Sequence, residues 1–321
     1  MFVTQNYLSS KVERPPGSIF KEPALYQVVL VDLRVPSTKA CRPRSPADDH
    51  KHPHDSLLTE VLNYALNLEY LEGEFYSCAA TGQPLPSDLR GGGPASTGCR
   101  KAKLNNRTQA IAEELADNEI AHVTLLRHVL GHAAVPIPRL NIGLAFGKAA
   151  DLAVGETLRP AFSPYSGSLS FLHGAFIFED VVRIALVEGY QSGIIRDELY
   201  HSIDKVVHAN FTVADLVDAI ATHRATHHAK AGDHSLHEGL EQDDGTLTLV
   251  PVTKQGLVHT RTPAEVIVIV TLGAKDRKGG FFPEGLNGKF GSVASSIKEE
   301  RKKKKEERRK DEKDKKAKHD D

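Results

Sequence analysis

The sequence predicts a mainly α-helical fold, arranged as an up-down helical bundle with long loops. Two segments, 55–81 and 107–132, repeat apolar side chains at the spacing of one helical face over several turns. A third segment, 171–200, contains no proline and is typical of one long helix or of two fused helices. Only short extended pieces are suggested elsewhere, so helices are expected to supply the core.

Capping and turn residues mark the ends of the first two helices. Asp55 is suited to be the N-cap of the first helix, which ends before the turn sequence "TGQPLP". Gly131 and Pro136 end the second helix. The stretch between the helices, 89–106, is longer than most loops in a compact domain, and loops of that length often have a purpose.

Residues 262–273 would suit either a helix or a strand. Their β-branched run, 266–271, is typical of a strand. However, Thr262 can act as an N-cap, Pro263 suits the first helical position, and Glu265 occupies the capping-box position. These three residues favour a helix. Shorter elements are expected elsewhere, as helices at 144–153 and 212–230 and as extended pieces at 25–32 and 246–252.

The chain is expected to have three parts. Residues 1–54 carry scattered prolines and no sustained period, which predicts a disordered or weakly structured extension. Residues 55–292 form the helical domain, and residues 293–321 form a charged tail, disordered or a frayed helix. Residues 298–321 hold 13 Lys/Arg and 9 Asp/Glu, so "KKKK" is better explained as part of a solvated tail than as a nuclear-localisation patch.

Composition excludes several classes of protein. The tail's surplus of four positive charges and the net charge of −1 leave −5 on the rest of the chain, which gives no general reason to bind nucleic acid. No apolar run approaches 18 residues, so no membrane span is expected. Three widely spaced cysteines argue against a disulfide framework and a zinc ribbon. No persuasive secretory signal is present; the compartment stays open, and an intracellular one is favoured.

Ionisable side chains interrupt the apolar stripes of the first two helices. Glu119 and His122 share the stripe of Leu115 and Leu126, and Glu69 lies on the interior stripe of the first helix. Charged groups rarely face a core unless they are paired or bind a metal. A Glu-x-x-His pair and an inward Glu on another helix are the pattern of carboxylate proteins that bind two Fe or Mn ions.

Other charged positions are explained as well or better by exposure to solvent than by metal binding. Glu72 lies one turn after Glu69 between apolar neighbours and is a candidate ligand, although a solvated helix face explains it as well and explains Glu74 better. His223 and His227 could chelate a metal at i, i+4, but a polar helix end is favoured. No nucleophilic arrangement stands out, and "RGGGP" does not join a strand to a helix, so no catalytic or cofactor-binding residue is assigned.

Several stretches of the domain carry a resemblance to a known family. They are "LLTEVLNYALNLEYLEGEFY", "LPSDLRGGGPASTGCRKAKL", "AEELADNEIAHVTLLR" and "RTPAEVIVIVTLGAKDRKGGFFPEGLNGKF", supported by "FLHGAFIFEDV" and "GYQSGIIRDELY". The sequence resembles the desiccation-related protein family, a ferritin-like group first described in desiccation-tolerant plants. The match spans roughly 55–292, and its glycine-rich and C-terminal stretches are the most specific.

The resemblance implies a ferritin-like bundle and a role in tolerance to drying or related stress. It implies that Glu69, Glu119 and His122 match the metal ligands of the first two helices. Glu179 would be the carboxylate of the third helix, and Glu188 would begin the Glu-x-x-His of the fourth. It implies no particular reaction, because no catalytic activity is firmly established for the family.

Two departures from the family pattern concern the third and fourth helices. Gln191 stands where the second His is expected. Glu179 and Glu188 are nine positions apart, which at 100° per residue puts them on opposite faces of one continuous helix. We therefore expect an incomplete or shortened region, caused by a missing segment or by a helix break near Gly189.

These departures favour a non-catalytic, stress-related scaffold, and an enzyme is not the preferred interpretation. The alternative is a di-iron or di-manganese carboxylate protein that binds metal or reduces oxygen or peroxide. In it Glu69 and Glu119 would bridge or chelate Fe or Mn, and His122 would be a ligand. Glu179 or Glu188 would close the other side of the site. Because an incomplete bundle would leave the apolar stripes of the first two helices partly uncovered, pairing with a second copy is also expected.

Overall fold

The computed structural model describes residues 53–179, 186–226, 239–240, 247–251, 261–274 and 276–290. The chain divides into two units, Met1–Ser37 and Thr38–Asp321, and all described residues lie in the second. The predictions for 1–52, for 25–32, for His227 and for the charged tail lie outside the described residues. Among the described helices, none combines the length and apolar character that a membrane span requires.

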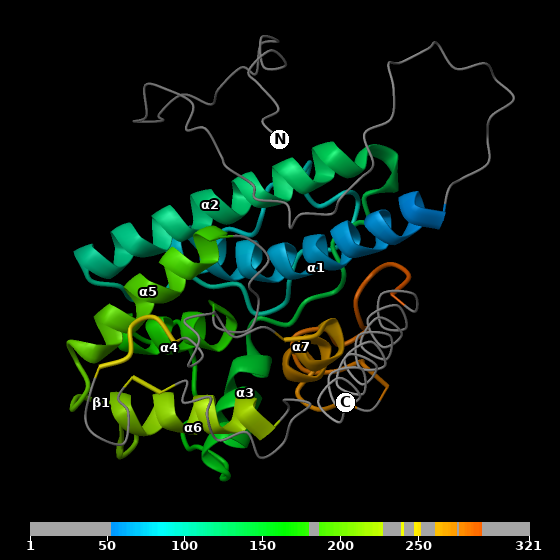
Figure 1. The fold of residues 1–321 in the computed structure, drawn as a ribbon. Coiled ribbons are helices and arrows are strands. Elements are labelled where there is room, and N and C mark those ends of the chain that lie inside the picture. The colour runs from blue at the N-terminus through cyan, green and yellow to red at the C-terminus, as the bar shows by residue number, and fades with distance from the viewer. Residues whose placement is uncertain are drawn as a thin grey trace, which may run out of the picture. The chain divides into compact units, whose positions relative to one another are not determined.

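The described part of the chain is mainly helical, as predicted (Figure 1). Its elements are α1 (Pro53–Thr81), α2 (Asn106–Leu130), the 3-10 helix η1 (Gly131–Ala133), α3 (Leu144–Val154), α4 (Ser168–Glu179), α5 (Leu186–Tyr200), β1 (Val206–His208), β2 (Phe211–Thr212), α6 (Val213–Thr226) and α7 (Pro263–Val270).

Helices α1 and α2 lie side by side and run in opposite directions (Figure 1). Asn105 caps α2, because its side chain accepts a hydrogen bond from the Thr108 N–H at 2.8 Å. The chain leaves α2 at Gly131, as predicted. Residues 63–80 of α1 are all buried, so this helix is covered on every side along that length. The reason given for pairing with a second copy, an uncovered stripe, therefore does not apply to this part of α1.

The segment 171–200 forms two helices rather than one. Helices α4 and α5 contact each other, which successive parts of one straight helix would not do. Gly189 is the fourth residue of α5, so the helix is continuous through this residue, and α4 and α5 are separated before it rather than at it. The argument that placed Glu179 and Glu188 on opposite faces assumed one continuous helix, and it therefore does not apply.

The remaining elements close the domain beneath these helices. Helix α6 packs against α3 and α4, and the antiparallel pair β1–β2 precedes it. The sequence did not predict this hairpin, whose turn contains Ala209 at a φ of 49°. Helix α7 begins with the predicted capping box: Thr262 Oγ1 accepts from the Glu265 N–H, and Glu265 accepts from the Thr262 N–H.

A disulfide joins Cys78 of α1 to Cys99 of the long loop, a single cross-link that the sequence did not predict. The Glu74 carboxylate also holds the connection between α1 and α2, because it accepts hydrogen bonds from the Ser96 hydroxyl of this loop and from the Leu85 N–H before it. Glu74 is fully buried, which corrects the prediction of a solvated position. The connection between α1 and α2 is therefore attached to the C-terminal part of α1 by one disulfide and two hydrogen bonds.

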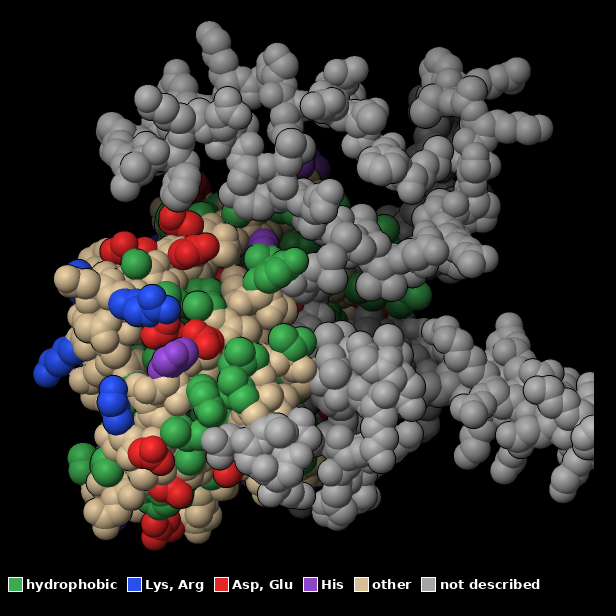
Figure 2. Space-filling view, turned by 60° about the vertical axis from the view of Figure 1, so that its left-hand side comes forward, with side chains coloured by type: hydrophobic (Ala, Val, Ile, Leu, Met, Phe, Trp, Pro, Cys, Tyr) green, Lys and Arg blue, Asp and Glu red, His purple; other side chains and the backbone are tan. Residues whose placement is uncertain are grey.

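An aromatic cluster fills the core where α1, α3, α4 and the C-terminal segment meet. The ring of Phe146 lies 4.8 Å from that of Phe75 and 4.9 Å from that of Phe281. Phe178 also lies 4.9 Å from Phe281. Such offset and edge-on pairs add to the stabilisation from burial. On the outer face in Figure 2, apolar side chains lie in patches between acidic and basic ones over the described residues.

Candidate metal centre

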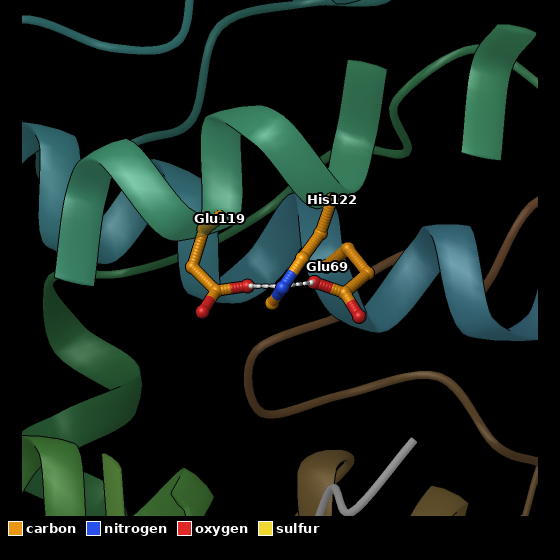
Figure 3. Close-up of side chains that lie close together, drawn as sticks. All are labelled: Glu69, Glu119 and His122. Carbon is orange, nitrogen blue, oxygen red and sulfur yellow. Dashed lines mark hydrogen bonds and ion pairs between the residues drawn. The ribbon is translucent and has the colours of Figure 1, made fainter. Parts of the chain in front are cut away.

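Helices α1 and α2 bring Glu69, Glu119 and His122 together (Figure 3). His122 Nδ1 lies 3.1 Å from Glu69 Oε2 and 3.0 Å from Glu119 Oε2. Both carboxylates are buried, and the imidazole is 13% exposed. The i, i+3 spacing of Glu119 and His122 places both groups on the side of α2 that faces α1. The predicted half-site is therefore assembled in the structure.

A second set of carboxylates adjoins this half-site. One oxygen from each of Glu69, Glu72 and Glu188 lies within 4.8 Å of the other two. Glu179 is also buried, and it accepts a hydrogen bond from the hydroxyl of Tyr76. Glu179 and Glu188 therefore line the same interior. The prediction that they face opposite sides fails because α4 and α5 are separate helices that pack together.

Glu72 is a buried carboxyl group that no hydrogen bond stabilises among the described residues. It is 1% exposed, and neither of its carboxylate oxygens has a hydrogen-bond partner among the described residues. Burial raises the pKa of Glu72 well above its usual value, and the nearby charges of Glu119, Glu179, Glu188 and Glu69 raise it further. The solvated-face explanation of Glu72 is therefore wrong.

Glu119 and His122, the two members of the half-site that lie on α2, both bind protons strongly in the absence of a cation. Burial raises the pKa of Glu119 to about 8; the charge of Glu69 adds to this effect, and the hydrogen bond with His122 opposes it. Burial alone would lower the pKa of His122, but hydrogen bonds and charges from Glu119 and Glu69 raise it to about 11. The protons on Glu119 and His122 therefore offset the negative charge that a bound cation would otherwise neutralise.

Gln191 of α5 links the second set of carboxylates to the half-site of α1 and α2. Its Nε2 donates a hydrogen bond to Glu119 Oε1 at 2.8 Å, while Glu119 Oε2 faces His122. The amide oxygen of Gln191 is buried and has no hydrogen-bond partner among the described residues. Gln191 thus lies inside the cluster at the position where the family pattern led us to expect a His. Sequence reasoning gave no indication of its contact with Glu119.

The residues present fit a pair of divalent transition-metal ions. Five carboxylates and one imidazole are the donor types that Fe and Mn prefer. Burying several carboxylates without counter-charge costs several kcal/mol per ion, which a bound cation offsets. Among the described residues, both groups of three or more candidate ligands belong to this cluster. His223 lies on α6, outside both groups.

Inward carboxylates and a Glu-x-x-His pair on packed helices are typical of ferritin-like proteins. Residues 58–201 match the ferritin-like domain family.

Two curated relatives refine this class. The chain is 28% identical over 273 residues to the desiccation-related protein PCC13-62 of Craterostigma plantagineum, covering 74% of this chain and 85% of that protein. It is 27% identical over 284 residues to the ferritin-like catalase Nec2 of Nesocodon mauritianus, covering 79% and 90%. The chain thus matches the ferritin-like domain over residues 58–201 and is similar over most of its length to a desiccation-related protein and to a ferritin-like catalase. No solved structure matches it.

Proposed function

We propose that the helical domain binds two divalent Fe or Mn ions and that the loaded protein breaks down hydrogen peroxide. The observation that carries the metal proposal is Glu72, a buried carboxyl group with both oxygens lacking hydrogen-bond partners among the described residues. A polar group in this state costs free energy unless a ligand satisfies it. Four more carboxylates surround it, so a cation is the complementary ligand.

The preference for peroxide rests on a relative and on access. One relative of similar length is called a ferritin-like catalase. The imidazole of His122 is partly exposed, whereas Glu69 and Glu119 are almost wholly buried. A small oxidant therefore suits this edge better than a large substrate.

The chain's own residues would position the ions and manage protons. The bound ions would supply the electrons exchanged with peroxide, of which two molecules give two of water and one of oxygen. Glu119 and His122 must lose the protons they hold before both can act as ligands. Helices α1, α2, α4 and α5 carry the ligands, so the side chains are held by packed elements rather than by loops.

A non-catalytic scaffold is the second candidate. It is favoured by Gln191, which removes one imidazole from the ligand pattern of two-metal carboxylate proteins. The second relative's name, which refers to desiccation, also specifies no reaction.

Peroxide consumption separates the two candidates. Protein loaded with Fe or Mn should consume hydrogen peroxide, and Glu72→Gln should abolish this activity because one carboxylate ligand is lost. Glu114→Gln is the matched control, since Glu114 is exposed on α2, and it should behave as the unaltered protein. Bound metal without peroxide consumption would remove the catalase assignment and leave the metal centre.

A further inference from the structure

The cluster contains two potential metal positions with different donor atoms. The first set is Glu69, Glu119 and His122, which offers one imidazole nitrogen. The second is Glu69, Glu72 and Glu188, which offers only carboxylate oxygens. Glu69 belongs to both sets and therefore adjoins both positions.

Gln191 keeps nitrogen out of the second position. It lies at the i, i+3 position after Glu188, but an amide nitrogen has no lone pair to give to a metal, and here it donates to Glu119. The atom that Gln191 can offer is its amide oxygen, which has no hydrogen-bond partner among the described residues. Any ligand contribution from Gln191 is therefore another oxygen.

The imidazole is correspondingly confined to the first position. His122 Nδ1 lies within 3.1 Å of oxygens of Glu69 and Glu119, whereas the second set of ligands contains no imidazole among the described residues. Imidazole ligands favour the later first-row metals, whereas oxygen-only sites suit Mn²⁺. The two positions should therefore differ in metal preference.

We propose that this chain binds two different metal ions: the His122 position selects a later first-row ion such as Fe²⁺ or Co²⁺, and the oxygen-only position beside Gln191 accepts Mn²⁺. This inference rests on the proposed two-metal centre, and it adds that Gln191 makes the two positions unequal. The geometry that carries it is the pair of ligand sets that share Glu69 and differ in their nitrogen.

The test uses Co²⁺ and Mn²⁺ as probes. The full chain is freed of metal and incubated without oxygen with two equivalents of Co²⁺ per chain and a large excess of Mn²⁺, because most sites prefer Co²⁺ to Mn²⁺ at equal concentrations. The protein is then desalted, and bound metal is counted by elemental analysis. The unaltered chain should hold one Co²⁺ and one Mn²⁺. Electron paramagnetic resonance should show Mn²⁺ without a second Mn²⁺ beside it.

Two variants should change the ratio of bound Co²⁺ to bound Mn²⁺ in opposite directions. Gln191→His should bind two Co²⁺ ions because both positions then contain an imidazole. His122→Gln should lose Co²⁺ selectivity at the first position and bind more Mn²⁺. Gln83→His is the control, because Gln83 is exposed and outside both ligand sets. Circular dichroism establishes that each variant is folded.

The outcomes distinguish this inference from the proposed function. Two identical ions in the unaltered chain, or an unchanged ratio in a folded Gln191→His or His122→Gln variant, would overturn the inequality of the positions while leaving metal binding intact. Failure of the unaltered chain to bind either ion would overturn the two-metal centre itself.

Discussion

At the scale of single residues, protons and metal cations compete for the same carboxylates of the candidate metal centre. Spacing alone selected Glu69, Glu119 and His122, because each falls on an apolar helical stripe. Spacing could not decide the fates of Glu72 and Glu74, since burial depends on which elements pack against α1. The structure buries both, and of the two only Glu74 receives hydrogen bonds, from Leu85 and from Ser96 of the loop.

The metal-free protein should lose stability as the pH rises. The pKa values of Glu119 and His122, about 8 and about 11, lie above the ordinary values of 4.5 and 6.5. Each group therefore binds more protons in the folded state than in the unfolded state at pH values between its ordinary pKa and its raised pKa. Their stabilising contribution is full below the unfolded pKa values and is lost as the pH rises through the folded values. Urea unfolding in a chelator should therefore give a lower unfolding free energy at pH 9 than at pH 6.

The size and origin of this effect are both measurable. A full one-proton difference contributes about 1.4 kcal/mol per pH unit. A Glu119→Gln, His122→Gln double variant should show a much flatter dependence, because both groups are then neutral at every pH. A variant with the same slope as the unaltered chain would assign the effect to other groups.

At the scale of elements, helix ends were more predictable than helix contacts. Thr262, Pro263 and Glu265 identified the start of α7 because a capping box is a local interaction. The relation between Glu179 and Glu188 was not local. The angular argument assumed one straight helix, whereas α4 and α5 contact each other and bring both carboxylates to Glu72. The pairing of Cys78 with Cys99 was likewise set by the folding of the loop onto α1.

The disulfide should stabilise the domain by restricting the unfolded chain. Its cysteines are 21 residues apart, and closing a loop of this size is worth about 3 kcal/mol. Replacing Cys78 and Cys99 together by Ser should lower the unfolding free energy by that order, as measured by urea unfolding without reductant. Cys41→Ser serves as the comparison. If the double variant unfolds at the same urea concentration as the unaltered chain, the disulfide does not constrain the unfolded state.

At the scale of the whole molecule, the buried helix α1 organises both the core and the site. Its residues 63–80 are buried throughout, and within that length Phe75 joins the aromatic cluster while Glu69 and Glu72 face the other carboxylates. The sequence predicted the mainly helical, ferritin-like fold because its longest apolar patterns are helical. It did not reveal how α4 and α5 complete the site, since that depends on contacts between distant segments.

Counting the ions bound by the metal-free chain tests the central claim most directly. Anaerobic titration at neutral pH with Fe²⁺ or Mn²⁺, followed by calorimetry in buffers of different ionisation enthalpy, gives both the stoichiometry and the protons released. We predict two ions per chain at micromolar concentration, with protons released to the buffer as the ions displace them from Glu119 and His122. Absence of binding by the folded chain at these concentrations would contradict the account.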